Sequence, residues 1–406
     1  MTGNLRRLIQ GTLFITAGIL FLLSPADCLA QEELISPPAK KITSFPFTQL
    51  TGGVIIVKAH LDDFTDTLNF VLDTGGGGIS LDSGTCAYFG LKKEPSDRLI
   101  RGIAGMKYAE FAKGHSIVFP GLRIDNLDFH INDYEILTSA YGIRIDGIVG
   151  YTFFRRYIVM INYDKEIVDV LEPGSFKYPK GGFLLNPQFT TLPMQYATIK
   201  DNTEVNAKFY FDTGAGLSLM LNDEIVADSA IISKKRKQYL TEVEGLGGKK
   251  PTIITVVKEV RLGPYKFKNV PAHIFNDEFN ITPYPILGGL IGNDLLRRFN
   301  VILNYPEQQI YIKPNTHFTD AFDYSYTGLG IYLIDGAITV TDIIKGSPAE
   351  ESGLREGDVV IGVENNFTNN IQTYKTLLQN AKTRVQIVVI RNNKLEVFYL
   401  KVKSIL

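Results

Sequence analysis

Two copies of the triplet Asp-Thr-Gly are the residues of this sequence best suited to chemistry. They are Asp73-Thr74-Gly75 and Asp212-Thr213-Gly214, and each follows an apolar run typical of a buried strand. A single triplet of this kind is more often a turn or a helix cap than a functional group. Two triplets in matching surroundings indicate one paired site.

A pair of aspartates can hydrolyse a peptide bond without a metal or a covalent nucleophile. Two carboxylates held about 3 Å apart cannot both ionise, so they share one proton. The ionised member accepts a proton from water, and the protonated member donates to the carbonyl oxygen. Such close approach needs a glycine after each triplet's threonine. We expect the two threonine hydroxyls to secure it by bonding to the opposite copy's backbone.

An internal repeat surrounds the two triplets. Residues 70–72, which precede the first triplet, correspond to residues 209–211 before the second. Further along, the apolar-apolar-Gly segment of residues 148–150 corresponds to residues 290–292, and a pair of arginines follows each. Matching features in the same order indicate two copies of one lobe.

Residues 45–315 resemble aspartic peptidases of the retropepsin type. The resemblance rests on both triplets and on the segments Ile148-Val149-Gly150 and Leu290-Ile291-Gly292, where that family packs a loop beneath the catalytic strand. It implies a mainly β fold with two similar acid-protease β-barrel lobes, no cofactor, no metal, and a peptide or protein substrate. The implied catalytic residues are Asp73 and Asp212, supported by Thr74, Gly75, Thr213 and Gly214.

Each lobe also has a glycine-rich segment that matches the flaps of this family, the hairpin tips that open and close over substrate. Ordinary hairpin turns are the alternative interpretation. The sequence departs from the family pattern at Gly76, where retropepsins carry alanine, although Ala215 fits. The candidate flap residues are Gly102, Ile103, Gly105, Gly245, Leu246 and Gly247.

The C-terminal part, residues 321–406, resembles a PDZ domain, with a helix expected over residues 373–381. Leu329-Gly330-Ile331 matches the loop that captures a peptide's terminal carboxylate with backbone N–H groups. Residues 347–358 match a segment typical of PDZ domains in bacterial exported peptidases. The resemblance implies a C-terminal peptide ligand. The alternative is a domain that only packs on the second lobe.

The N-terminus has the pattern of a secretory signal peptide. Arg6 and Arg7 precede an apolar run over residues 8–23, and small residues follow near Ala30. Cleavage would leave an exported protein, periplasmic or extracellular, and an uncleaved segment would anchor it to the membrane. A lipoprotein signal is less favoured because Asp27 precedes Cys28.

Other features exclude several classes of function. With 42 Lys and Arg against 43 Asp and Glu, the charge gives no reason to expect nucleic acid. Cys86 is expected to be a packing residue, and no Gly-x-Ser-x-Gly motif is present. The histidines lack metal-ligand spacing; they are His60, His115, His130, His273 and His317.

The sequence therefore predicts a monomeric aspartic endopeptidase whose PDZ domain recruits or senses peptide C-termini. An exported, catalytically silent peptide-binding scaffold is the alternative. Residues 31–45 are expected to form a loose polar arm at the start of the first lobe. The predicted segments are a signal peptide over residues 1–30, lobes over 31–175 and 176–320, and a PDZ domain over 321–406.

Overall fold

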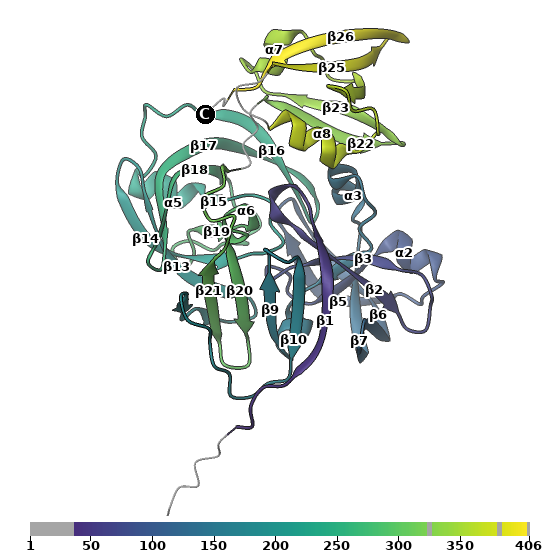
Figure 1. Cartoon of the computed structure of the whole chain (residues 1–406), viewed down its shortest axis with the longest axis vertical. Coiled ribbons are helices and arrows are strands. Elements are labelled where there is room, and N and C mark those ends of the chain that lie inside the picture. Colours follow the sequence, from purple (N-terminus) through teal and green to yellow (C-terminus); the bar gives the residue numbers. More distant parts are fainter. Residues whose placement is uncertain (1–35, 323–326, 380–383, 404–406) are drawn as a thin grey trace, which may run out of the picture. The chain divides into compact units, whose positions relative to one another are not determined.

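The computed structural model describes residues 36–322, 327–379 and 384–403, so the predicted signal peptide lies outside the described residues. Within them the fold is mainly β, as predicted, with three sheets (Figure 1). The elements of the first lobe are β1 (Lys41–Gln49), η1 (Thr51–Gly53), β2 (Ile55–Leu61), β3 (Leu68–Leu72), β4 (Ile79–Asp82), α2 (Ser83–Tyr88), β5 (Glu94–Gly102), β6 (Gly105–Phe119), β7 (Leu122–Asn132), α3 (Glu135–Tyr141), β8 (Gly147–Val149), α4 (Tyr151–Phe154), β9 (Ile158–Asn162) and β10 (Ile167–Leu171).

The second lobe repeats most of this order of elements. Its elements are β11 (Phe183–Leu185), β12 (Gln188–Phe189), β13 (Pro193–Lys200), β14 (Glu204–Phe211), β15 (Leu219–Asn222), α5 (Asp223–Ser229), β16 (Tyr239–Gly245), β17 (Gly248–Leu262), β18 (Tyr265–Phe275), β19 (Gly289–Ile291), α6 (Asn293–Leu296), β20 (Phe299–Asn304) and β21 (Gln309–Pro314). The residues between β18 and β19, all of which are described, contain no helix to match α3, and β12 stands where the first lobe has η1.

Strand pairing confirms that the lobes are two copies of one β-barrel. In the first lobe the strands are paired in the order β2-β3-β8-β4-β7-β6-β5, and β2 also pairs with β6 to close the barrel. The second lobe has β13-β14-β19-β15-β18-β17-β16, with the same closure between β13 and β17. In both barrels a short strand, β8 or β19, runs parallel to the strand that leads into Asp-Thr-Gly.

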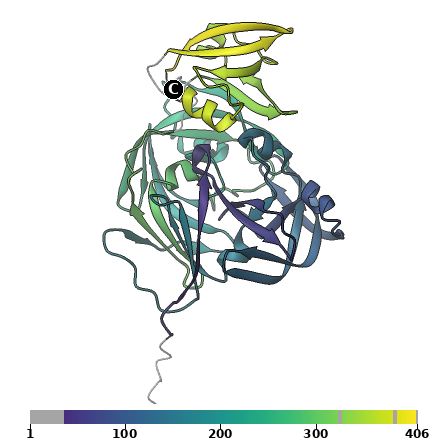
Figure 2. The same ribbon diagram turned by 45° about the vertical axis from the view of Figure 1, so that its right-hand side comes forward.

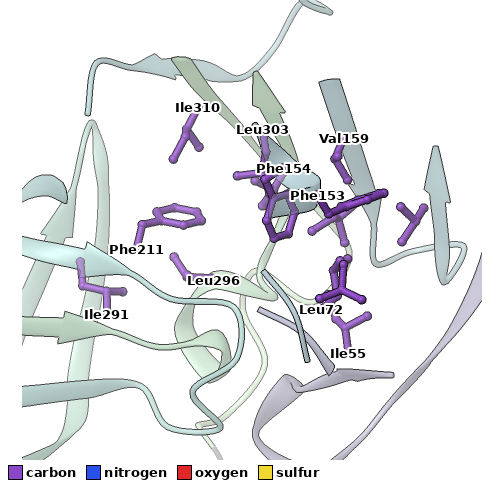
Figure 3. Close-up of a cluster of buried hydrophobic side chains, with 14 of the residues drawn as sticks. Ile55, Leu72, Phe153, Phe154, Val159, Phe211, Ile291, Leu296, Leu303 and Ile310 are labelled. Atoms are coloured by element: carbon purple, nitrogen blue, oxygen red, sulfur yellow. The ribbon is translucent and has the colours of Figure 1, made fainter. Parts of the chain in front are cut away.

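The two lobes are joined by one continuous sheet and one core. Strands β11, β21 and β20 continue into β9, β10 and β1, and Val301 of β20 pairs with Ile161 of β9. Buried side chains from both lobes form a single apolar cluster, which includes Phe154 of the first lobe and Leu303 of the second (Figure 3). Because strands of both lobes share this sheet, the predicted boundary between residues 175 and 176 stays a prediction.

The expected loose arm was wrong from Lys41 onward. Residues 41–49 form β1, which pairs with β10 and then with β2. Phe45 is buried and stacks on Phe119 with ring centroids 5.0 Å apart. The strand-like alternation of apolar and polar residues in this segment is short, and it follows directly on polar residues, so the sequence pattern did not indicate a strand. Burial of Phe45 and Phe47 is what holds the strand in place.

The C-terminal domain has its own sheet, in the order β22-β23-β24-β25-β26, and its own apolar core. Helix α8 lies on one face of this sheet, in the yellow part of Figure 2. The predicted helix therefore exists, although it begins at Ile371. The elements are β22 (Leu329–Ile334), β23 (Ala337–Ile343), α7 (Pro348–Ser352), β24 (Val359–Val363), α8 (Ile371–Leu378), β25 (Arg384–Arg391) and β26 (Lys394–Lys401).

The shared sheet and core lead to a prediction about assembly. Both lobes lie in one chain and bury their apolar surfaces against each other, so no second chain is needed to complete the site. We expect sedimentation to show one chain per particle, and activity per molecule to stay constant on dilution. A second-order dependence of activity on protein concentration would contradict this.

Candidate active site

Asp73 and Asp212 lie immediately after β3 and β14, at equivalent places in the two barrels. The backbone N–H of Asp73 donates to Val149 O over 2.9 Å, and that of Asp212 donates to Ile291 O over 3.0 Å. The acceptors belong to β8 and β19, the apolar-apolar-Gly segments of the sequence. Each aspartate is thus held at its backbone by the short strand of its own lobe.

The two threonines bond across the lobes in a reciprocal pattern. Thr74 Oγ1 donates to Phe211 O at 2.6 Å, and Thr213 Oγ1 donates to Leu72 O at 2.9 Å. Each hydroxyl also accepts from the other threonine's N–H, at 3.1 Å for Thr74 N and 3.0 Å for Thr213 N. Both side chains are fully buried, so four backbone groups depend on these two hydroxyls.

The glycines of both triplets let the carboxyl groups approach the opposite lobe. A Cβ atom on Gly75 would lie 2.4 Å from Asp212 Oδ2, and one on Gly214 would lie 2.2 Å from Asp73 Cγ. Backbone at these positions therefore touches the opposite carboxyl group directly. Any side chain there would push the two aspartates apart.

The two carboxyl groups hydrogen-bond to each other in a protein-enclosed setting. Burial, then the charge and hydrogen bond of Asp212, raise the pKa of Asp73 well above its ordinary value of 3.8. Burial also raises the pKa of Asp212, although backbone N–H groups of Gly214, Ala215 and Gly75 act in the opposite direction. Two carboxyl groups in this arrangement can share one proton.

The loops after the triplets are held differently in the two lobes. In the second lobe, Ser218 donates to the buried carboxylate of Asp294, which also pairs with Arg297. In both lobes backbone bonds hold the loop: in the first, Tyr151 N donates to Gly76 O at 2.8 Å and Gly150 N to Gly78 O at 2.9 Å, and in the second, Asn293 N donates to Ala215 O at 2.7 Å. The run of glycines is thus anchored, and Asp73 is placed like Asp212.

The candidate flap residues lie on two hairpins whose tips meet. The first hairpin joins β5 to β6, and the second joins β16 to β17. Ala104 N at the first tip donates to Leu246 O at the second, over 3.2 Å. Glycine is required here, because a Cβ atom on Gly102 would lie 2.2 Å from Leu246 O.

The barrel faces beside the two triplets differ in chemistry. In the second lobe, Ile103 from the opposite hairpin packs on an apolar cluster that includes Met220, Phe275 and Leu290. In the first lobe, Ser80 occupies the register position of Met220, opposite Ile148. The neighbouring polar groups bond to one another: Ser80 Oγ lies 2.7 Å from Tyr134 OH, and Asn132 donates to the same oxygen at 2.9 Å.

Sequence reasoning did not single out Ser218, Asp294 or Tyr134. Their partners are distant in sequence, although comparing the two repeats position by position would have marked Ser80 against Met220. In the PDZ domain, the predicted residues Leu329, Gly330 and Ile331 lie on β22, the edge strand of its sheet.

Cys86 is buried in the core, as expected for a packing residue. Burial lowers the pKa of His130 and of His273 to about 4, so both imidazoles are neutral at pH 7. Across the described parts of the chain, no cluster of three or more His, Cys, Asp or Glu could hold a metal ion. No helix within the described ranges is long and apolar enough to cross a membrane.

The reciprocal threonine bonds lead to a stability prediction. Thr213→Val keeps the shape of the side chain but leaves Leu72 O and Thr74 N without their partner. Because both groups are buried, we expect a loss of about 1–3 kcal/mol in the free energy of unfolding, measured in urea. Thr74→Val should behave alike, and Thr48→Val at an exposed strand position should change little. An unchanged unfolding midpoint for both buried variants would contradict the structural role.

Comparison with known proteins agrees with this geometry. A family model described as aspartyl protease matches residues 57–153 and 196–295, and a PDZ domain model matches residues 339–391. The matches fall on both lobes and on the C-terminal domain.

One curated relative is named as a probable periplasmic serine endoprotease of DegP type from Chlamydia pneumoniae. It is 35% identical over 57 residues, which is 14% of this chain and only 12% of the relative. That similarity is too short to carry the relative's activity over to this chain. The two family models match a far larger part of the chain. The chain therefore contains a retropepsin-like aspartyl protease region followed by a PDZ domain.

Proposed function

We propose that this protein is an aspartic endopeptidase in which Asp73 and Asp212 activate one water molecule. The observation that carries the proposal is the close approach of the two carboxyl groups, each of which lies directly against the glycine of the opposite triplet. Burial raises the pKa of both carboxyl groups, while the partner raises the pKa of Asp73 and lowers that of Asp212, as in a pair that shares one proton. The family matches support the same reaction class.

The surrounding N–H groups favour particular roles for the two aspartates. Backbone N–H groups of Gly214, Ala215 and Gly75 stabilise negative charge on Asp212. Asp73 Oδ1 accepts from Gly75 N at 2.7 Å, whereas Asp212 Oδ1 accepts from both Gly214 N and Ala215 N, at 2.9 and 3.1 Å, so we assign the shared proton to Asp73. Asp212 is thus the base that takes a proton from water, and Asp73 is the acid that protonates the substrate carbonyl oxygen.

The proton balance closes over one turnover. Water attacks the carbonyl carbon, its proton passes to Asp212, and the proton of Asp73 passes to the carbonyl oxygen. In the second step the C–N bond breaks, Asp212 protonates the leaving nitrogen, and a hydroxyl of the diol returns a proton to Asp73. No metal or covalent intermediate enters either step.

The two hairpins supply a cover for this chemistry. Their tips touch, and Ile103 already packs on the apolar face of the second lobe. We assign Gly102, Ile103, Gly105, Gly245, Leu246 and Gly247 as flap residues. A closed cover excludes water and holds the substrate, while opening admits and releases peptide.

We further propose an exported protein whose PDZ domain binds peptide C-termini through Leu329, Gly330 and Ile331. The N-terminal sequence pattern supports export, and the matched relative is named as periplasmic. The PDZ family match supports peptide binding at the edge of β22.

The proposed dyad leads to a direct prediction. Asp73→Asn and Asp212→Asn should each lower peptide cleavage at least about 100-fold, since general acid–base catalysis contributes roughly 10²–10⁴-fold. Cleavage of a mixed peptide library would be read by mass spectrometry. The control is Asp66→Asn, an exposed aspartate of the same lobe, which should leave the rate unchanged.

A statine-type transition-state mimic should inhibit the native chain, and a serine-directed reagent should not. Full activity in either single variant would overturn the dyad. A native chain that binds peptides but never cleaves them would instead indicate a scaffold protein.

The electrostatics also predict the pH dependence. The working pair carries one proton, so activity falls above the pH at which the pair loses that proton and below the pH at which it takes up a second one. Both pKa values are raised from 3.8, which moves this window upward. Neither Gly76 nor Ala215 offers a hydroxyl to stabilise the ionised form. We expect a bell-shaped profile with a mildly acidic optimum. A rate that still rises towards about pH 2 would contradict it.

A further inference from the structure

The peptide-binding side of the PDZ domain lies against the two lobes. Strand β22 is the edge of its sheet, so its open side and helix α8 are where a peptide would add as a further strand. Helix α3 of the first lobe lies beside β22, and α8 contacts η1 of the same lobe. The chain's own elements therefore cover the surface that a ligand would use.

Side chains of α8 bind the C-terminal end of α3. Lys375 Nζ donates to Ala140 O at 2.7 Å, and Gln372 Nε2 donates to Tyr141 O at 2.9 Å. Carbonyl groups at the end of a helix lack partners within it, and a positive charge there is favourable. These bonds therefore hold α8 against the first lobe, at the C-terminal end of α3, where Gly142 caps the helix.

A second contact reaches the hairpin of the other lobe. Tyr332 of β22 donates from its hydroxyl to the carboxylate of Glu244, on β16. Lys249 of the same hairpin lies over the Tyr332 ring, with Nζ 4.1 Å from the ring centroid. Glu244 directly precedes Gly245, which meets Ile103 of the opposite hairpin. The PDZ domain thus holds the second hairpin one residue from its tip.

Between these contacts lies a small, acidic cavity of about 140 Å³. Ligand pockets usually measure about 300–1,000 Å³, so no peptide fits here while the contacts persist. Its lining includes Gly330 and Ile331 and the carboxylates of Glu242, Glu244 and Asp342, against one cation, Lys375. Lys249 also pairs with Glu242 at 3.2 Å, which leaves three carboxylates against two cations, so a ligand carboxylate would meet an excess of negative charge unless the hairpin withdrew Glu242 and Glu244.

We propose that the PDZ domain is a latch on the second hairpin, released when a peptide with a free C-terminal carboxylate binds along β22 and α8. Peptide and hairpin compete for one surface, so ligand binding frees the hairpin to open. Release then raises the rate at which substrate enters. This proposal rests on the proposed peptidase function for its effect on rate, but the competition itself is independent of catalysis.

Linkage makes the competition measurable from both sides. Glu244→Ala and Tyr332→Phe remove the same hydrogen bond from opposite partners. Each should speed hydrogen exchange of the backbone over residues 239–254, and should raise cleavage several-fold. Each should also tighten binding of C-terminal peptides roughly tenfold, because the peptide no longer has to compete with a hydrogen bond to a charged group. The control is Glu110→Gln, an exposed glutamate on the hairpin of the first lobe.

The experiment uses the full chain and a fluorescent peptide pool with randomised C-terminal residues, prepared as free acids and as amides. Binding and exchange are measured with Asp212→Asn in every variant, so that no peptide is cut. Tighter binding of the acids alone, with faster hairpin exchange in both latch variants, is the expected result. Equal binding of acids and amides, or unchanged exchange in both variants, would overturn the latch. Absence of cleavage in otherwise native chains would instead count against the proposed peptidase function.

Discussion

Each lobe supplies the hydroxyl that completes the other lobe's buried backbone. Leu72 O and Phe211 O lie at the ends of the strands that carry the aspartates, and each receives a threonine hydroxyl from across the interface. A buried carbonyl or N–H group without a partner costs about 1–3 kcal/mol. Separating the lobes would leave four such groups unpaired, so the distance between the two aspartates is fixed by backbone rather than by their own side chains.

This constraint extends outward through the glycines and the core. The carboxyl groups can meet only because Gly75 and Gly214 bring bare backbone against them. The strands behind them are held in turn by β8 and β19, and by a core that both lobes share. Phe154 of the first lobe stacks on Tyr305 of the second, with centroids 5.4 Å apart. The packing of the whole interface therefore keeps the two carboxyl groups close together and buried. Both conditions raise the pKa of Asp73.

Features that show in the pattern of neighbouring residues could be predicted from the sequence. Features that depend on residues far apart in the sequence could not. The dyad, the repeated barrels and the PDZ fold follow from motifs and alternation, which are properties of neighbouring residues. The hydrogen bond between Glu244 and Tyr332 joins residues 88 positions apart in different domains. Neither residue stands out by type or spacing. Residues 41–45 were misjudged for a related reason, since only the partner β10 makes that short segment a strand.

The two lobes carry the same residue at the threonines, which bond to each other, and different residues at the equivalent positions 80 and 220. Thr74 and Thr213 bond reciprocally, so a change in either one leaves unpaired groups in both lobes. Ser80 and Met220 hold equivalent register positions but do not bond to each other: Ser80 lies in a polar network, and Met220 lies in an apolar cluster that also receives Ile103 of the first lobe. Each could change without disturbing its counterpart. A symmetric pair of identical chains must present the same surface twice. Placing both lobes in one chain removes that requirement, so the faces on either side of the two aspartates can differ in chemistry while the reciprocal threonine bonds between the lobes are kept.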